Sequence, residues 1–463
     1  MDTTALLPVY RQIYLRYRQS IADGRLRPGD RVPSVRALAA ELNLARGTVE
    51  AAYQLLIGEG YLLSRGPAGT VVAPQLQTSS ALAPASSLPA EPALFHDGRQ
   101  PMALQMGLPA LDAFPRKLWN RLASRELRQG GIDALVYPDP RGLAALRRAV
   151  AGYLGISRGI SCTSGQVFIC AGYRAGLELI QRAVLQPGDA CWFEDPGYFM
   201  ARRVLQAAAI KLVPVPVDEH GLQVSVGVGR APNARCALVT PTHQSPLGVS
   251  LALPRRQALL EWAERNHSWI IEDDYDSEYR YHGRPLPALK SLDREGRVLY
   301  CGTFSKVLMP GLRLAYVVVP SGQVARFTDT ADVLHNHCPQ LLQATVASFI
   351  EQGHFARHLK KMRSLYGQRR EWLTTALREA LGDRLQIDNG AGGMHVLARL
   401  AAGSDDAGVA RRARQVGLAM EPLSPWYLES PASSGLLMGF TNVLDPAQGA
   451  EVAGRLRKVL EAT

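Results

Sequence analysis

Short apolar runs separated by helix-length segments are the feature that most limits the fold of this chain. Parallel strands need long crossover connections between them, and these connections are usually helices. The alternation therefore predicts an α/β domain with a mainly parallel sheet over residues 96–463. The strands we expect are Gln166–Cys170, Ala190–Phe193, Ala237–Val239, Trp269–Ile271, Val298–Tyr300 and Leu314–Val319.

The composition is that of an ordinary globular protein with room for more than one domain. Of its 463 residues, 47% are apolar and 20% are charged. No run of apolar residues is long enough to predict a membrane span, and the N-terminus lacks the pattern of a secretion signal. Six cysteines without a C-x-x-C pair are typical of reduced thiols, so we expect a cytoplasmic protein. The net charge of +11 permits nucleic-acid contact without demonstrating it.

The first 73 residues carry the signals of a small helical domain with a hairpin. Apolar residues at three- and four-residue steps predict a helix that ends near 23–24. Ser34 is a candidate N-cap for a second helix, and a third helix is expected to start near Arg46. Residues 61–72 read as two short strands around a glycine-bearing turn, Gly66-Pro-Ala-Gly69.

The pattern from Val32 to Val71 resembles the GntR family of DNA-binding domains. The resemblance implies a winged helix-turn-helix whose third helix enters the major groove. At the start of that helix, Arg46 is expected to contact bases or phosphates, with Thr48 beside it. Arg36 is assigned to a phosphate, and Arg65, in the wing, to the neighbouring groove or backbone. We call this domain the DNA-binding head. A single head is expected to bind DNA with modest affinity, so we expect a dimer that binds paired half-sites.

A segment rich in Pro, Ala, Ser and Leu follows this domain. Residues 74–95 contain one charged residue and no convincing periodicity, which indicates a flexible linker. The chain therefore divides into a DNA-binding domain (1–73), a linker (74–95) and a large α/β domain (96–463).

A lysine in a glycine- and serine-rich turn follows one of the predicted strands. Lys306 ends the motif Gly302-Thr-Phe-Ser-Lys, and such an amine suits a Schiff base with pyridoxal 5′-phosphate. Upstream, Asp273 is expected to pair with the pyridine nitrogen of that cofactor. Asp274 is the alternative, because adjacent strand residues point to opposite faces and only one can meet the ring. Tyr275 then projects to the same side as Asp273.

Several motifs together resemble the fold-type I aminotransferases, and with the N-terminal head the whole chain resembles the MocR/GabR family of transcriptional regulators. The resemblance implies an aminotransferase-like domain that binds pyridoxal 5′-phosphate and forms a homodimer. The motifs are Ala113–Trp119, Tyr137–Gly142, Glu194–Tyr198, Thr242–Gly248, Glu272–Glu278 and Gly302–Lys306.

The resemblance also assigns roles around Lys306. Tyr275 is expected to hydrogen-bond the 3-oxygen of the cofactor, and Tyr198 or Phe199 to stack on its ring. A helix N-terminus and a fixed cation, Arg313, suit the phosphate. Tyr137 is expected to reach the phosphate of the other subunit. The remaining expected cofactor contacts are Gly172, Tyr173, Arg174, Gln244, Thr303 and Ser305.

Two positions depart from the aminotransferase pattern. Ser245 stands where these enzymes usually have Asn, so its contact with the 3-oxygen must come from Gln244, Ser245 or a neighbour. Leu437 stands where an arginine often clasps a substrate carboxylate. We therefore expect the effector to be an amine, a differently held acid or pyridoxal 5′-phosphate itself, in place of an ordinary α-amino acid.

Two histidine pairs have spacings that metal ligands can adopt. They are His335 with His337 and His354 with His358, and neither has the other ligands of a known zinc signature. We expect no metal site.

A cofactor-dependent DNA-binding transcriptional regulator accounts for every segment of the chain. An active aminotransferase with a vestigial head is the alternative, but it leaves the intact Arg36 and Arg46 pattern unexplained. A repressor with an inert large domain would not need Lys306, Asp273 and Arg313 together. The expected partners are operator DNA, a small-molecule effector and a second copy of the chain, with no membrane.

Overall fold

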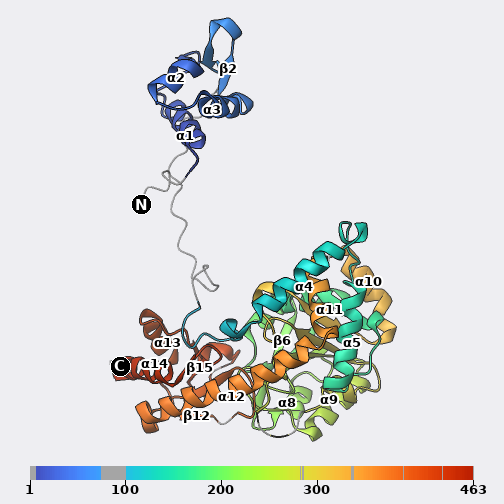
Figure 1. Cartoon of the computed structure of the whole chain (residues 1–463). Helices are drawn as coiled ribbons and strands as arrows, with labels where there is room; N and C mark the ends of the chain where they lie inside the picture. The colour runs from blue at the N-terminus through green and yellow to red at the C-terminus, as the bar shows by residue number, and fades with distance from the viewer. Residues whose placement is uncertain are drawn as a thin grey trace. The chain divides into compact units, whose positions relative to one another are not determined.

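The computed structural model describes residues 7–74, 101–281, 283, 286–334, 338–388, 390–429 and 431–461. The chain forms two compact units, one up to residue 99 and one from residue 100 (Figure 1). Apart from Pro74, the predicted linker lies outside the described residues, as do His335 and His337.

The N-terminal unit is a three-helix domain with a small antiparallel sheet of strand order β1-β3-β2. The Ser34 side chain accepts a hydrogen bond from the Ala37 amide at 3.1 Å, which confirms it as an N-cap. The third helix starts at Arg46, as predicted, whereas the two-residue strand β1 gave no sequence signal. The elements are α1 (Val9–Ala22), β1 (Arg31–Val32), α2 (Val35–Glu41), α3 (Arg46–Gly58), β2 (Leu62–Ser64) and β3 (Thr70–Val72).

Helix α3 carries the core of this unit. Val49, Ala52, Tyr53 and Leu56 recur at helical spacing and are buried. The Tyr53 hydroxyl donates to the Pro33 carbonyl at 2.8 Å, which ties the start of α2 to α3. Burial on this face leaves the opposite face and the N-terminal turn of α3 exposed to solvent.

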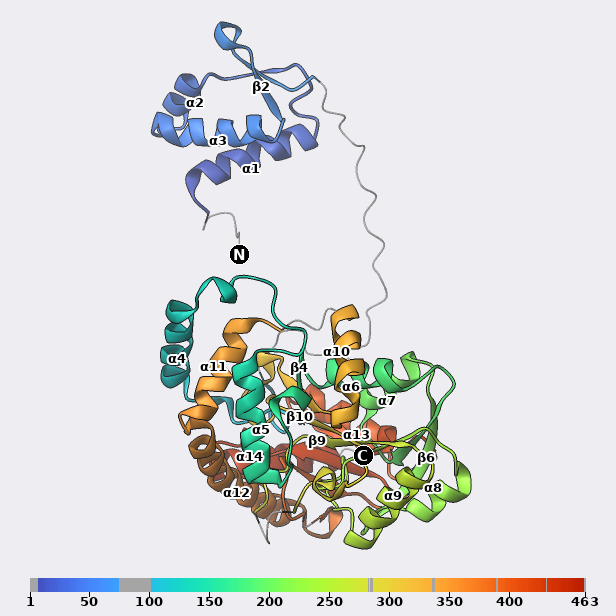
Figure 2. The same cartoon turned by 90° about the vertical axis from the view of Figure 1, so that its right-hand side faces the viewer.

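The second unit is built on an eight-stranded sheet of order β4-β11-β10-β9-β8-β5-β6-β7 (Figure 2). Its four central pairings, from β10 through β9, β8 and β5 to β6, are parallel, and the outer pairings are antiparallel. The mainly parallel sheet is thus confirmed, and so are all six predicted strands. Strand β6 was missed because Pro214 and Pro216 interrupt its apolar pattern. The strands are β4 (Val167–Cys170), β5 (Ala190–Asp195), β6 (Lys211–Asp218), β7 (Gly221–Leu222), β8 (Cys236–Val239), β9 (Trp269–Asp274), β10 (Val298–Thr303) and β11 (Ala315–Val318).

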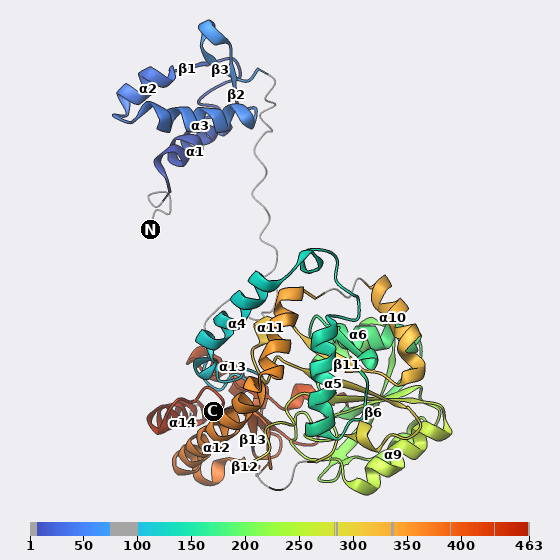
Figure 3. The same cartoon turned by 45° about the vertical axis from the view of Figure 1, so that its right-hand side comes forward.

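Helices cover both faces of this sheet, because alternate strand residues enter two separate cores. On β11, Tyr316 and Val318 pack on the side of α5, while Val317 packs on the side of α6 and α10 (Figure 3). The helices of this part are α4 (Arg116–Gln129), α5 (Ala144–Arg158), α6 (Tyr173–Val184), α7 (Phe199–Ala207), α8 (Val224–Arg230), α9 (Leu253–Arg265), α10 (Val324–Val333) and α11 (Gln340–Glu351).

A smaller antiparallel sheet of order β12-β13-β15-β14 follows the long helix α12. Two of its strands have two residues each, so the sequence analysis did not predict it. The elements are α12 (His354–Leu381), β12 (Gln386–Ile387), β13 (His395–Arg399), α13 (Asp406–Gln415), β14 (Glu421–Pro422), β15 (Gly435–Gly439) and α14 (Pro446–Glu461). None of the described helices is long and apolar enough to cross a membrane.

Candidate cofactor site and DNA-binding head

The two aspartates that end β9 face opposite sides of the sheet. The Asp274 carboxylate forms an ion pair with Arg158 at 2.7 Å and accepts a hydrogen bond from the Tyr300 hydroxyl at 2.7 Å. These buried partners compensate its charge. Asp273 projects to the other side, which leaves it as the carboxylate available to a bound ring.

Asp273 is 5% exposed and has no cationic side chain paired with it among the described residues. Burial raises the pKa of its carboxyl to about 7, against an opposing interaction with the Tyr173 hydroxyl. A buried carboxylate of this kind needs a positive partner to stay ionised. The protonated nitrogen of a pyridine ring is such a partner.

Lys306 lies in the turn after β10. Its Nζ donates to the Gly107 carbonyl at 2.9 Å. Burial lowers the pKa of Lys306, against the opposing charges of Asp276 and Asp273. A lowered pKa increases the fraction of neutral amine, the form that attacks an aldehyde. Glycine suits position 107, because its φ of 76° is left-handed and a Cβ there would lie 2.6 Å from Lys306 Nζ.

A cradle for an anion forms where α6 begins. Gly172 caps the helix with a φ of 94°, and Tyr173 and Arg174 follow in its first turn. The guanidinium of Arg313 lies against Gly172, where an added Cβ would be 3.1 Å from Arg313 Cζ. Arg313 also donates to the Ala171 carbonyl at 3.1 Å. A helix N-terminus beside a guanidinium suits a phosphate group.

Thr303 and Ser305 lie on the turn that carries Lys306. The Ser305 amide donates to Thr303 Oγ1 at 3.1 Å, and both side chains are partly exposed. The structure therefore brings two hydroxyls and the lysine together at the end of β10, as the sequence predicts for a phosphate-linked cofactor.

Tyr275 is held by a histidine that the sequence analysis did not assign. The Tyr275 hydroxyl lies 2.9 Å from His243 Nδ1, and the same nitrogen lies 3.0 Å from Asp276 Oδ1. Asp276 is buried, so His243 Nδ1–H is the natural donor to it. The Tyr275 hydroxyl proton is then free to point elsewhere. No periodicity or spacing in the sequence signals this contact.

The Gln244 side chain makes several contacts within its own chain. Its amide nitrogen donates to Glu194 Oε2, the Pro196 carbonyl and the Ser245 carbonyl at 3.1, 2.8 and 2.9 Å. Its amide oxygen accepts from the Leu247 amide at 2.9 Å. The side chain is buried and holds the loop through these contacts, so its predicted contact with the cofactor stays a prediction. Ser245, the alternative, contacts Tyr275.

The wall beside Asp273 is aromatic and apolar. Burial raises the pKa of Tyr198 to about 12, with Asp273 adding to the shift, which places this ring close to that carboxyl. Tyr198 packs against Phe199 and Trp426, with ring centroids 5.6 and 6.0 Å away. Leu437 is fully buried in the same cluster. Leu437 itself offers no charge at the position where the arginine is expected.

Tyr137 takes no part in the site of its own chain. Its side chain is 92% exposed, in a segment that also exposes Leu135 and Val136. The expectation that it reaches the other subunit stays a prediction. No group of three or more His, Cys, Asp or Glu residues in the described structure could hold a metal ion.

In the N-terminal unit, Arg36, Arg46 and Arg65 are exposed. They lie at the start of α2, the first residue of α3 and the hairpin turn, and none of them forms an ion pair with a described residue. Thr48 is partly buried in the first turn of α3. The three guanidinium groups are available to an external anion.

The comparisons with known proteins match both units. The family profile described as "Bacterial regulatory proteins, gntR family" covers residues 9–72, and that of "Aminotransferase class I and II" covers residues 113–434. The chain thus combines a GntR-type DNA-binding head with an aminotransferase-like domain.

Relatives that match the chain over most of its length identify its protein family more closely. The chain is 38% identical to the probable rhizopine catabolism regulatory protein MocR of Rhizobium meliloti, over 100% of this chain and 96% of that protein. It is 33% identical to the pyridoxine biosynthesis transcriptional regulator PdxR of Corynebacterium glutamicum, over 93% and 91%. A Pyrococcus horikoshii kynurenine aminotransferase matches with a TM-score of 0.71 and 28% identity, over 78% of this chain and 91% of that one. The chain belongs to the MocR family of transcriptional regulators.

Proposed function

We propose that this regulator binds pyridoxal 5′-phosphate through Lys306 and responds to a small-molecule effector at the same site. The observation that carries the proposal is the arrangement of three groups. A partly buried amine, an uncompensated buried carboxyl and a guanidinium at a helix N-terminus match the aldehyde, the ring nitrogen and the phosphate of the cofactor. The cofactor, when bound, supplies an electrophilic carbon that exchanges between amines.

The chain's own residues then define what the site accepts. Asp273 holds the proton on the ring nitrogen, Tyr275 donates to the ring oxygen, and Arg313 fixes the phosphate. Leu437, at the position where an arginine often holds an α-carboxylate, offers no charge to such a group. The effector is accordingly an amine, an acid held elsewhere, or pyridoxal 5′-phosphate itself. The relative PdxR is named for pyridoxine biosynthesis, which supports the last option.

The apolar residues around Leu437 also argue against transaminase activity on α-amino acids. Such enzymes discriminate substrates through the carboxylate clasp, and a buried leucine offers no hydrogen bond to it. Effector binding would shift the balance between arrangements of two DNA-binding heads in a homodimer, provided the effector binds these arrangements with different affinity.

The test is a titration of the purified protein with a panel of amines and α-amino acids, followed by the visible absorption of the bound cofactor. Binding to promoter DNA is measured in parallel by fluorescence anisotropy. The proposal expects a response to an amine, or to cofactor addition, in both readouts. Tight spectral exchange with an ordinary α-amino acid would overturn the effector assignment.

A further inference from the structure

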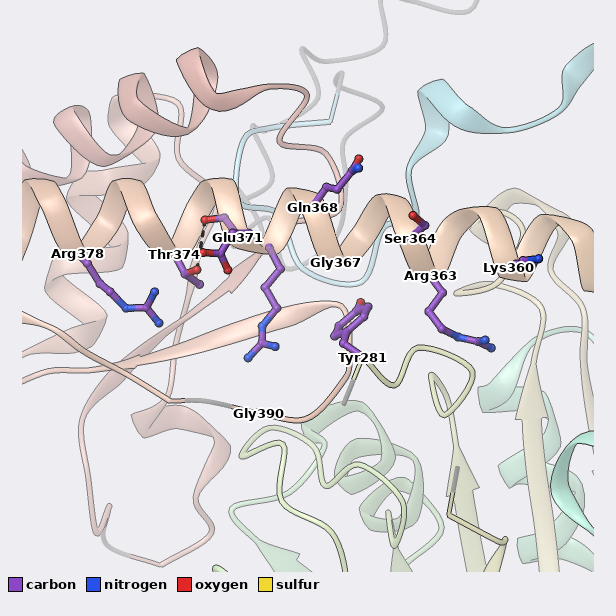
Figure 4. Close-up of a pocket in the computed structure, with 11 residues that line it drawn as sticks. Tyr281, Lys360, Arg363, Ser364, Gly367, Gln368, Glu371, Thr374, Arg378 and Gly390 are labelled. Atoms are coloured by element: carbon purple, nitrogen blue, oxygen red, sulfur yellow. Dashed lines mark hydrogen bonds between the residues drawn. The ribbon is translucent and has the colours of Figure 1, made fainter. Parts of the chain in front are cut away.

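A cationic groove of about 720 Å³ runs along one side of α12 (Figure 4). Its walls come from α12, from the loop after β9 and from the segment that precedes β13. We call it the α12 groove and define it by Tyr281, Lys360, Arg363, Arg370, Arg378 and Gly390. None of the residues around Lys306 lines it.

The charges of the α12 groove are unbalanced. Its lining residues include four cations, whereas Glu371 is the one carboxylate among them. Lys360, Arg363 and Arg370 form no ion pair with any described residue. Arg363 Nε donates to the Glu278 carbonyl at 3.0 Å, which orients the guanidinium without neutralising it. Figure 4 shows Arg363 and Arg378 reaching toward the same side of the helix as Tyr281.

Arg370 is the recessed cation of the α12 groove. It is half-buried, and its guanidinium lies over the Tyr281 ring at 5.8 Å from the centroid. Burial lowers the pKa of Arg370, against Tyr281 and Glu371, while Arg378 lowers it further. A partly desolvated cation with a second cation nearby raises the free energy of the empty groove. A bound anion would relieve that cost.

We propose that the α12 groove binds a small organic anion with two or more negative charges, of the class of phosphate esters and polycarboxylates. The volume lies within the range of about 300–1,000 Å³ that small-molecule sites occupy. Arg363 and Arg370 are seven residues apart, about 10 Å along the helix, so two anionic groups of one such molecule can reach both. The Tyr281 side chain lines the same groove and adds apolar surface beside these cations.

The recess of Arg370 favours a small ligand over a nucleic-acid backbone. Phosphates of a duplex contact cations at the outer surface of a protein. Arg370 lies instead between α12 and the Tyr281 ring.

The test is isothermal titration of the full-length protein with inorganic pyrophosphate at fixed ionic strength, in the presence of excess pyridoxal 5′-phosphate that fills the Arg313 cradle. Two neighbouring lysines provide a matched pair, because Lys360 lines the groove whereas Lys361 is exposed outside it. A lost charged hydrogen bond is worth about 1.5–3 kcal/mol. We therefore expect Arg370→Gln to weaken pyrophosphate binding at least about tenfold and Lys360→Gln about threefold, with Lys361→Gln within about twofold of wild type.

Arg313→Gln separates this proposal from the proposed function. That substitution removes the cation of the cofactor cradle and should leave the pyrophosphate affinity of the groove unchanged. Equal losses in Lys360→Gln and Lys361→Gln, or a loss in Arg313→Gln alone, would overturn the proposal. If Lys360→Gln and Arg370→Gln weaken binding of a random DNA duplex and leave pyrophosphate binding intact, the groove is a nucleic-acid surface and the proposal is wrong.

Discussion

At the scale of single residues, the site separates two adjacent aspartates by what surrounds them. Asp274 is compensated by Arg158 and Tyr300, so its charge is built into the fold. Asp273 has no such partner and is buried beside an amine and a tyrosine. A buried carboxyl without a cation is a cost that a bound pyridinium would offset. This difference gives the two neighbouring carboxylates separate roles and favours Asp273, which the sequence analysis preferred, over the alternative Asp274.

The first prediction concerns the pH dependence of stability without cofactor. Burial raises the pKa of Asp273 to about 7, above its value in an unfolded chain. The native state therefore keeps a proton that the unfolded state has released. The resulting stability is present below about pH 4 and is lost as the pH rises through about 7. Asp273→Asn, which is neutral throughout, should reduce this loss in urea unfolding at pH 5 and pH 8.

The reduction will be partial, because burial also raises the pKa of Glu194, Glu272 and Glu278 to about 7. Added pyridoxal 5′-phosphate should flatten the profile of the wild type and leave that of Asp273→Asn nearly unchanged. Identical pH profiles for the variant and the wild type would contradict the assignment of Asp273.

At the scale of elements, two short connections carry side chains of the cofactor site and of the α12 groove. The turn after β10 carries Lys306, and the loop after β9 carries both Tyr275 and Tyr281. The Tyr281 hydroxyl donates to the Gly393 carbonyl at 2.6 Å, and Gly393 lies against the His243 ring, where an added Cβ would be 2.1 Å away. One loop is therefore in contact with both the α12 groove and the histidine behind Tyr275.

The second prediction follows from this connection. Tyr281→Phe removes the hydrogen bond to Gly393 and loosens the support of His243. We expect the pH at which the visible absorption of the bound cofactor changes to shift, because Tyr275 would donate less firmly to the ring oxygen. Spectrophotometric pH titration measures the shift. Tyr10→Phe, in the N-terminal unit, is the control, and an equal shift there would refute the connection.

The third prediction belongs to helix α3. Arg46 is exposed at its first position, where residues of a recognition helix meet bases and phosphates. Arg46→Gln should weaken promoter binding at least about tenfold, since a good contact to a base is worth about 1–3 kcal/mol. Arg16→Gln removes an exposed charge from α1 and should change the affinity less than about twofold. Equal effects on fluorescence anisotropy would mean that only net charge matters.

At the scale of the whole molecule, Tyr137 is the one predicted cofactor contact that was assigned to the site of the other subunit. Tyr137 is exposed beside other exposed apolar side chains, so a second copy of the chain is the partner that would use it. The fourth prediction is that Tyr137→Ala weakens cofactor binding about tenfold, the cost of one charged hydrogen bond. Ile156→Ala, at a position that is also 92% exposed, should leave the affinity unchanged. Equilibrium dialysis of the cofactor distinguishes the two.

Much of this architecture could be predicted from the sequence, because it rests on local signals. The presence and the first residues of β9 and β10, the Ser34 cap and the opposite faces of Asp273 and Asp274 all follow from periodicity and turn residues, although both strands run three residues further than predicted. The contacts of His243 with Asp276 and of Gly107 with Lys306 could not be predicted. They join segments far apart in the chain, and neither leaves a pattern in either segment. The contacts of Gln244 with Glu194 and Pro196 were not predicted for the same reason, since these partners lie at the end of another strand.

The most direct test of the account is the visible absorption spectrum of the purified full-length protein, compared with that of Lys306→Ala after addition of pyridoxal 5′-phosphate. The account predicts a band of the covalently bound cofactor that borohydride fixes to the protein, and its loss in the variant. Lys290→Ala, which removes a partly buried lysine paired with Asp293 elsewhere in the same unit, should keep the band. No band in the wild type, or an unchanged band in Lys306→Ala, would contradict the central claim.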